Sequence, residues 1–67
     1  MFELGKTYKF SMNKQHTKNS IYTLTIEKVS EDAVSGVDKE GKRRGINLKY
    51  VFDWIEVEDE DYDYWEK

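Results

Sequence analysis

The chain has 67 residues, a formal net charge of −3 and no cysteine, so it is long enough for one small domain and contains neither disulfides nor thiolate metal sites. Its single histidine is too few for a histidine-based metal site. No apolar run approaches the roughly 20 residues that a membrane span requires, and residues 1–10 lack the pattern of a signal peptide. We therefore expect a cytoplasmic protein.

Alternation of apolar and polar side chains dominates the sequence and predicts β-strands. Five segments are predicted as strands, in chain order: residues 7–12, 21–29, 32–37, 43–48 and 53–58. In the second segment Val29 is out of phase with the preceding apolar residues, which predicts a β-bulge or the end of the strand. In the third segment two inward-facing sets fit: Val34 with Gly36, or Ala33 with Val37.

Between these strands the sequence predicts one long loop, one tight turn and one helical turn. The polar residues 13–20 predict the loop, and residues 47–52 the helical turn. The octet GVDKEGKR has the glycine and lysine spacing of a phosphate-binding loop, but Arg43 stands where a Ser or Thr would bind magnesium, and a strand-like stretch follows. We interpret residues 38–41 as a type I turn with Gly41 in the left-handed conformation.

The order of these elements resembles the SH3-like and Sm-like small barrels from Thr7 to Val57. The stretch SGVD is similar to the hydrophobic, Gly, Asp pattern of the Sm-like variants. The resemblance implies an all-β domain: residues 1–57 form a single five-stranded antiparallel barrel, and residues 58–67 follow as an acidic, aromatic C-terminal segment. Because this fold hosts many functions, the function has to be argued from other features.

Charge is divided unequally, with a balance of +4 over residues 1–50 and −7 over residues 51–67. Acidic side chains crowd into one short stretch: Glu56, Glu58, Asp59, Glu60, Asp61 and Asp63. Three rings accompany them: Tyr62, Tyr64 and Trp65. A purely solubilising segment rarely carries three large aromatic residues. Three interpretations stay open: a disordered segment, a segment folded back on the barrel, or one that binds a partner.

Our first hypothesis is a non-catalytic binding module that engages a basic surface of a partner protein through the acidic segment. A nucleic-acid-mimicking inhibitor is one form of it, in which carboxylates stand in for phosphates and rings for bases. Carboxylates would orient docking and buried rings would supply most of the affinity. The predicted partner-binding residues are Tyr50, Phe52, Trp54, Glu58, Asp59, Glu60, Asp61, Tyr62, Asp63, Tyr64 and Trp65.

The alternative hypothesis is a small-barrel protein that binds nucleic acid, with the acidic segment as an autoinhibitor. Its phosphate contacts would come from the basic hairpin and the residues after it: Lys39, Lys42, Arg43, Arg44 and Lys49. Self-association through open strand edges is a third possibility, and the sequence leaves the oligomeric state open.

We expect no enzymatic activity, no cofactor, no metal and no membrane partner. The sequence shows no motif that joins a nucleophile to a base. Asp59, Asp61 and Asp63 follow the one, three, five spacing of a calcium-binding loop, but Tyr64 stands where that loop requires glycine.

Overall fold

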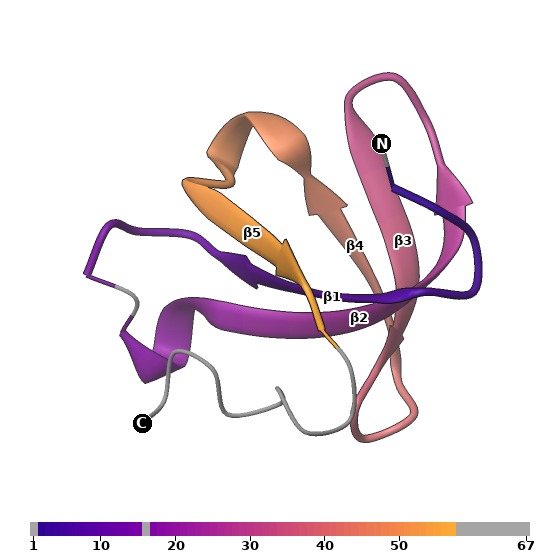
Figure 1. Cartoon of the computed structure of the whole chain (residues 1–67), viewed down its shortest axis with the longest axis horizontal. Coiled ribbons are helices and arrows are strands. Elements are labelled where there is room, and N and C mark those ends of the chain that lie inside the picture. The colour runs from indigo at the N-terminus through magenta and orange to yellow at the C-terminus, as the bar shows by residue number, and fades with distance from the viewer. Residues whose placement is uncertain (1, 16, 58–67) are drawn as a thin grey trace.

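The computed structural model describes residues 2–15 and 17–57. Its strands are β1 (Thr7–Ser11), β2 (Ile21–Val29), β3 (Ala33–Asp38), β4 (Arg43–Asn47) and β5 (Asp53–Glu56), and two short 3-10 helices, η1 (Lys18–Ser20) and η2 (Leu48–Tyr50), precede β2 and β5. The strands form one antiparallel sheet in the order β4-β3-β2-β1-β5 (Figure 1). The all-β prediction, its five strands and its helical turn are therefore confirmed. Among these residues, no helix has the length and apolar character needed to cross a bilayer.

The sheet is open, and the prediction of a closed barrel is wrong in that respect. Strands β4 and β5 form the two edges, and within residues 2–15 and 17–57 they do not pair with each other. The turn η2 lies between these strands in the chain, and its Leu48, together with Val51, packs against the core. Side chains, and not a fifth set of hydrogen bonds between β4 and β5, therefore cover this side of the core.

The core lies on one face of the sheet. Its buried side chains come from four strands and from the residues before β1: Phe2, Tyr8, Phe10, Leu24, Ile26, Val34 and Ile46. The ring of Phe2 meets that of Tyr8 edge to face at 5.0 Å between centroids, a favourable aromatic geometry. The backbone N–H of Glu3 donates to the Tyr8 hydroxyl at 2.9 Å, which gives this buried phenol a hydrogen-bond partner and holds Phe2 over the core.

Strand β2 is irregular where it pairs with β3. The pairing register between the two strands shifts between Ile26 and Lys28, and β2 ends at Val29, so both alternatives left open by the sequence, a bulge and the end of the strand, occur here. Gly36 lies opposite Ile26, and a Cβ atom at Gly36 would overlap the backbone carbonyl of Thr25. The two backbones thus approach so closely that only glycine fits. Of the two inward-facing sets left open by the sequence, the structure has Val34 with Gly36.

The turn between β3 and β4 is the predicted hairpin. The N–H of Asp38 donates to the carbonyl of Lys42 at 2.8 Å, and the N–H of Gly41 donates to the carbonyl of Asp38 at 3.0 Å. Gly41 has a φ of +85°, the left-handed conformation expected for it. The Asp38 carboxylate also accepts the N–H groups of Glu40 and Lys42, both at 2.9 Å. The Asp38 carboxylate already accepts the backbone N–H groups that would have to bind a phosphate. The loop is therefore a turn and not a phosphate-binding loop.

Candidate partner-binding site

Three predicted partner-binding rings are exposed along the segment from η2 to β5. The exposed fractions of Tyr50, Phe52 and Trp54 are 63%, 58% and 41%. We call these three residues the aromatic patch. Single apolar residues on a surface need no explanation, but three large rings within five positions are unusual and are typical of an interaction surface.

Two of these rings border a hollow with an apolar floor. It has a volume of about 200 Å³ and is lined by Phe2, Leu48, Val51, Phe52 and Trp54. The Trp54 ring lies 4.7 Å from that of Phe2 and 5.7 Å from that of Tyr8, measured between centroids. One side of the indole is thus held by the core while the other remains accessible. A ring fixed in this way loses little conformational entropy when a partner covers it.

The backbone that carries the aromatic patch is held at both ends. Asn47 caps η2, and Leu48 donates its N–H to the carbonyl of Asp32 at 2.8 Å. The N–H of Phe52 donates to the carbonyl of Ser11 at 2.8 Å, and β5 then pairs with β1. The three rings therefore project from a fixed scaffold.

The charge beside the aromatic patch is predominantly acidic. The Lys6 ammonium lies 3.3 Å from a carboxylate oxygen of Glu56 and 3.9 Å from one of Glu3. The hydrogen bond to Glu56 and the negative charge of Glu3 raise the pKa of Lys6. Lys6 thus forms ion pairs with two carboxylates. Asp53 adds a further exposed carboxylate on β5. A basic partner surface would complement this edge.

The basic hairpin is partly neutralised by its own neighbours. Arg44 Nε lies 2.8 Å from Asp38 Oδ2, and its guanidinium stands over the Tyr22 ring at 5.5 Å from the centroid. Arg43 Nε lies 3.4 Å from Glu27 Oε1, although this arginine is largely exposed. Two of the five cations predicted to bind nucleic acid therefore already have acidic partners.

The five cations also do not gather in one place. Lys39 and Lys42 are exposed at the turn, with Arg43 at the start of β4. Lys49 lies beyond the other end of this five-residue strand, on the order of 13 Å further along the chain direction, with its ammonium 5.2 Å from the centroid of the Tyr50 ring. The structure thus places Lys49 with the aromatic patch and the other four at the hairpin.

No protein-family model matches this chain, and no curated protein or solved structure is significantly similar to it. Function is therefore argued from these surfaces. Within the part of the chain that the structure describes, no three His, Asp or Glu side chains converge as a group that could hold a metal ion.

Eight of the predicted partner-binding residues lie outside the described residues: Glu58, Asp59, Glu60, Asp61, Tyr62, Asp63, Tyr64 and Trp65. Their role stays a prediction. The sequence did not indicate that Phe2, Leu48 and Val51 share the floor of the hollow. Phe2 and Val51 lie outside the predicted strands, and Leu48 is the last residue of the fourth predicted strand. For Leu48 and Val51 the sequence signal was their apolar character within the predicted helical turn, and for Phe2 it was its apolar character alone.

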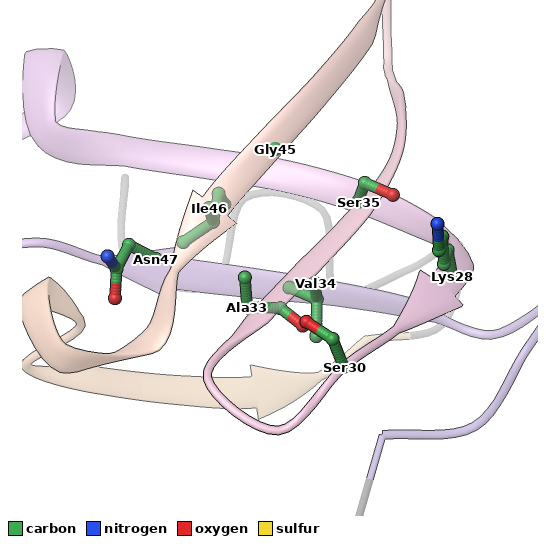
Figure 2. Close-up of a pocket in the computed structure, with 8 residues that line it drawn as sticks. All are labelled: Lys28, Ser30, Ala33, Val34, Ser35, Gly45, Ile46 and Asn47. Carbon is green, nitrogen blue, oxygen red and sulfur yellow. The ribbon is translucent and has the colours of Figure 1, made fainter.

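A second hollow, of about 320 Å³, lies where β2 ends and β3 pairs with β4 (Figure 2). Its lining consists of Lys28, Ser30, Ala33, Val34, Ser35, Gly45, Ile46 and Asn47. Val34 and Ile46 belong to the core, so this hollow is an incompletely covered end of the core beside the bulge. None of the predicted site residues lines it.

The contact between Asp38 and Arg44 predicts a specific dependence of stability on pH. The hydrogen bond from Arg44, followed by that from the N–H of Lys42, lowers the pKa of Asp38 below its ordinary value of 3.8. The unfolded state therefore binds a proton more readily than the folded state, and the contribution of Asp38 to stability is lost as the pH falls through 3.8 and the lower folded value.

We expect Asp38→Asn to be less stable than the natural chain at pH 6, and we expect this difference in stability to shrink as the pH falls below 3.8, as measured by urea unfolding between pH 6 and pH 2. The asparagine keeps an oxygen for the amides of the turn but has no charge for Arg44. All other carboxylates are shared by the two proteins, so their titration cancels in the comparison. A difference of equal size at pH 2 and pH 6 would contradict the assignment.

Proposed function

We propose that the protein is a non-catalytic binding module that engages a basic surface of a partner protein. Its contact surface comprises the aromatic patch and the acidic residues 58–67. The exposure of three large rings on a fixed segment, next to an apolar hollow, is the observation that carries the proposal. Scattered apolar exposure would not require a partner, whereas this patch leaves a substantial apolar area in water.

The two parts of the surface have different physical roles in this proposal. Burial of Phe52 and Trp54 against a partner supplies affinity, because large aromatic side chains dominate interface energetics. The acids along β5 and in residues 58–67 accelerate and orient the encounter with a basic surface, and this effect weakens with salt. We expect both parts to be required for tight binding.

A nucleic-acid-binding protein is the partner class that fits this charge best. Such proteins present clustered Lys and Arg to phosphates and aromatic side chains to bases. Residues 58–67 carry six carboxylates and three rings, so they offer both kinds of contact in one short segment. Inhibition by mimicry of nucleic acid is the form of the function that we propose.

We also propose that the fold is an open relative of the SH3-like small barrels. The order β4-β3-β2-β1-β5, with η2 between the last two strands, supports this relationship. The assignment bears on architecture alone, because this fold hosts many functions.

The proposal is tested with the full chain as bait in extracts of its native cell. The double variant Tyr50→Ala/Phe52→Ala removes two rings of the aromatic patch. The matched control is Val29→Ala. Val29 is an apolar residue that is 42% exposed, and it lies at the C-terminal end of β2, outside the aromatic patch. We expect a basic protein to be captured by the natural chain and by Val29→Ala. With the purified partner, calorimetry should show at least tenfold weaker binding for the double variant, a loss of about 1.4 kcal/mol.

Two further measurements separate this function from its alternative. A DNA oligonucleotide should compete with the bait for the partner if the chain mimics nucleic acid, and it should not bind the purified chain. Equal affinity of the natural chain and the double variant for the partner would overturn the proposal. Direct DNA binding that is lost in Lys39→Gln/Lys42→Gln would favour the alternative, which has less structural support because Arg44 is held by Asp38.

A further inference from the structure

Strand β4 is an edge of the sheet, and one of its two sides has no partner strand in the part of the chain that the structure describes (Figure 1). The hairpin before it shows which backbone groups bond to β3. The N–H of Asp38 donates to the carbonyl of Lys42 at 2.8 Å, so these two residues form a hydrogen-bonded pair. Because bonded and non-bonded pairs alternate along an antiparallel ladder, Arg44 and Ile46 are the residues of β4 that bond to β3.

The other three residues of β4, Arg43, Gly45 and Asn47, direct their backbone N–H and C=O groups away from β3. The bond from the N–H of Leu48 to the carbonyl of Asp32 at 2.8 Å agrees with this alternation at the far end of the strand. All three residues are exposed, and within the described residues these backbone groups have no hydrogen-bond partner. The open side of β4 is therefore a row of donors and acceptors to which a further strand can pair.

Proline, lysine and β-bulges commonly protect an edge strand from such pairing. Strand β4 contains neither proline nor lysine, and its register with β3 runs without a shift. The opposite edge is different, because the Asp53 carboxylate accepts the N–H of Trp54 at 2.9 Å. A donor of β5 is thus already occupied, whereas those on the open side of β4 are available.

The surface beside β4 also leaves space for another chain. The hollow of about 320 Å³ in Figure 2 and a further hollow of about 190 Å³ are both lined by Gly45, Ile46 and Asn47. A Cβ atom at Gly45 would have only one neighbour within 4 Å, the carbonyl oxygen of Val34 at 3.9 Å. The middle of β4 is therefore open to the close approach of a second backbone.

We propose that β4 pairs antiparallel with β4 of a second copy of this chain, with the twofold axis at Gly45. The two sheets then join into one. In this register Gly45 lies opposite Gly45 of the second copy, and Arg43 lies opposite Asn47. Because the three outward residues are evenly spaced about Gly45, each of them meets an outward residue of the other copy, and the two residues of each pair exchange two hydrogen bonds. An interface of this kind, in which each copy contributes the same surface, closes as a dimer.

Charge favours a second copy over an acidic strand of another protein. Arg43 Nε lies 3.4 Å from Glu27 Oε1, and Arg44 Nε lies 2.8 Å from Asp38 Oδ2, so each arginine of β4 already has a carboxylate of its own chain. In the proposed register the two copies of Arg43 are four residues apart along the strands. This separation is about 13 Å, which is longer than the screening length of about 8 Å at physiological salt.

The neighbouring registers satisfy the edge less well. A shift in one direction places Arg44 directly opposite Arg44 of the second copy, and like charges in this position are destabilising. A shift in the other direction places Arg43 opposite Lys49, which belongs to η2 and not to a strand. The register centred on Gly45 avoids both faults. The contact uses no residue of the aromatic patch, so the inference does not rest on the proposed function.

The first test measures the average mass of the full chain by sedimentation equilibrium between about 10 µM and 1 mM, because a contact through one short strand is small and weak. The mass should rise from the 8.0 kDa of one chain toward twice that value. Gly45→Pro removes the central outward N–H and no bond to β3, so this variant should keep the circular dichroism of the natural chain and the mass of one chain.

Gly45→Ala keeps the outward N–H and is the matched control. Its dissociation constant should lie within about threefold of that of the natural chain. A natural chain with the mass of one copy at every concentration would overturn the proposal. Association of a folded Gly45→Pro as tight as that of the natural chain would overturn it as well, because the contact would then lie elsewhere.

The second test needs no variant and determines the register. In a mixture of differently labelled copies, a nuclear Overhauser contact is expected between the Hα atoms of Arg44 in one copy and Ile46 in the other. These residues form a non-hydrogen-bonded pair with Cα atoms about 4.5 Å apart. Contacts between β4 of one copy and β5 of the other would show a head-to-tail assembly and would overturn the proposal, as would the absence of any contact between copies at β4.

Discussion

Gly36→Ala is expected to unfold most of the protein. The added Cβ would overlap the backbone carbonyl of Thr25 and stand 3.1 Å from the Cα of Ile26. Neither strand can yield, because β3 is held between β2 and β4 and the core packs beneath it. Overpacking of this kind costs about 3 kcal/mol or more, and a domain of this size has a total stability of about 3–5 kcal/mol. Far-ultraviolet circular dichroism should show a largely unfolded chain at 25 °C. On heating, the unfolding transition should be broad or absent.

Gly45→Ala is the matched control on the adjacent strand. The atom closest to a Cβ at Gly45 is the carbonyl oxygen of Val34, at an ordinary distance of 3.9 Å. Because the backbone there does not have a positive φ, alanine should change the free energy of unfolding by less than about 1 kcal/mol. Equal stability of the Gly36 and Gly45 variants would disprove the close backbone approach of β2 and β3 at Gly36.

Phe10→Ala is expected to have the second large effect. The side chain is 0% exposed, and its ring lies 5.5 Å from that of Phe2 and 6.3 Å from that of Tyr8. Truncating a buried phenylalanine costs about 3–5 kcal/mol, because the apolar transfer energy is lost and a cavity remains. Urea unfolding measures this loss of stability. If the variant is largely unfolded, its nuclear magnetic resonance spectrum should lack dispersed methyl signals.

Tyr50→Ala provides the contrast for the core variant. This ring is 63% exposed and contacts the Lys49 ammonium, so its truncation should cost less than about 1 kcal/mol. The comparison also serves the functional test, because a Tyr50 variant that stays folded cannot lose its partner through unfolding. A stability loss in Tyr50→Ala as large as that in Phe10→Ala would mean that the aromatic patch is part of the core.

Local patterns in the sequence were sufficient for the strands and the hairpin. Alternation through Tyr8 and Phe10 predicts β1 because consecutive side chains of a strand point to opposite faces. The phase slip at Val29 predicts a bulge in β2 or the end of that strand for the same reason. Gly41 follows from the backbone geometry of its turn, which involves only neighbouring residues. Tyr50, Phe52 and Trp54 were also singled out from the sequence as a surface.

Only the tertiary structure decided how these elements meet. The sequence predicted closure into a barrel, but β4 and β5 remain the two edges of the described sheet, and Leu48 and Val51 pack against the core between them. The close approach of Gly36 to the backbone of Thr25 follows from the pairing of β3 with β2. The pairing of Arg44 with Asp38 depends on both strands of the hairpin.

Lys9 shows the physical reason for this division. Its place in the alternation puts it on the face of β1 opposite Tyr8 and Phe10, and it is nevertheless 0% exposed. Its full burial could not be predicted, because alternation determines to which face a side chain belongs, whereas what covers that face depends on residues far away in the sequence. The sequence by itself therefore determined the two faces of each strand, and the packing of distant segments decided which of them are closed to water.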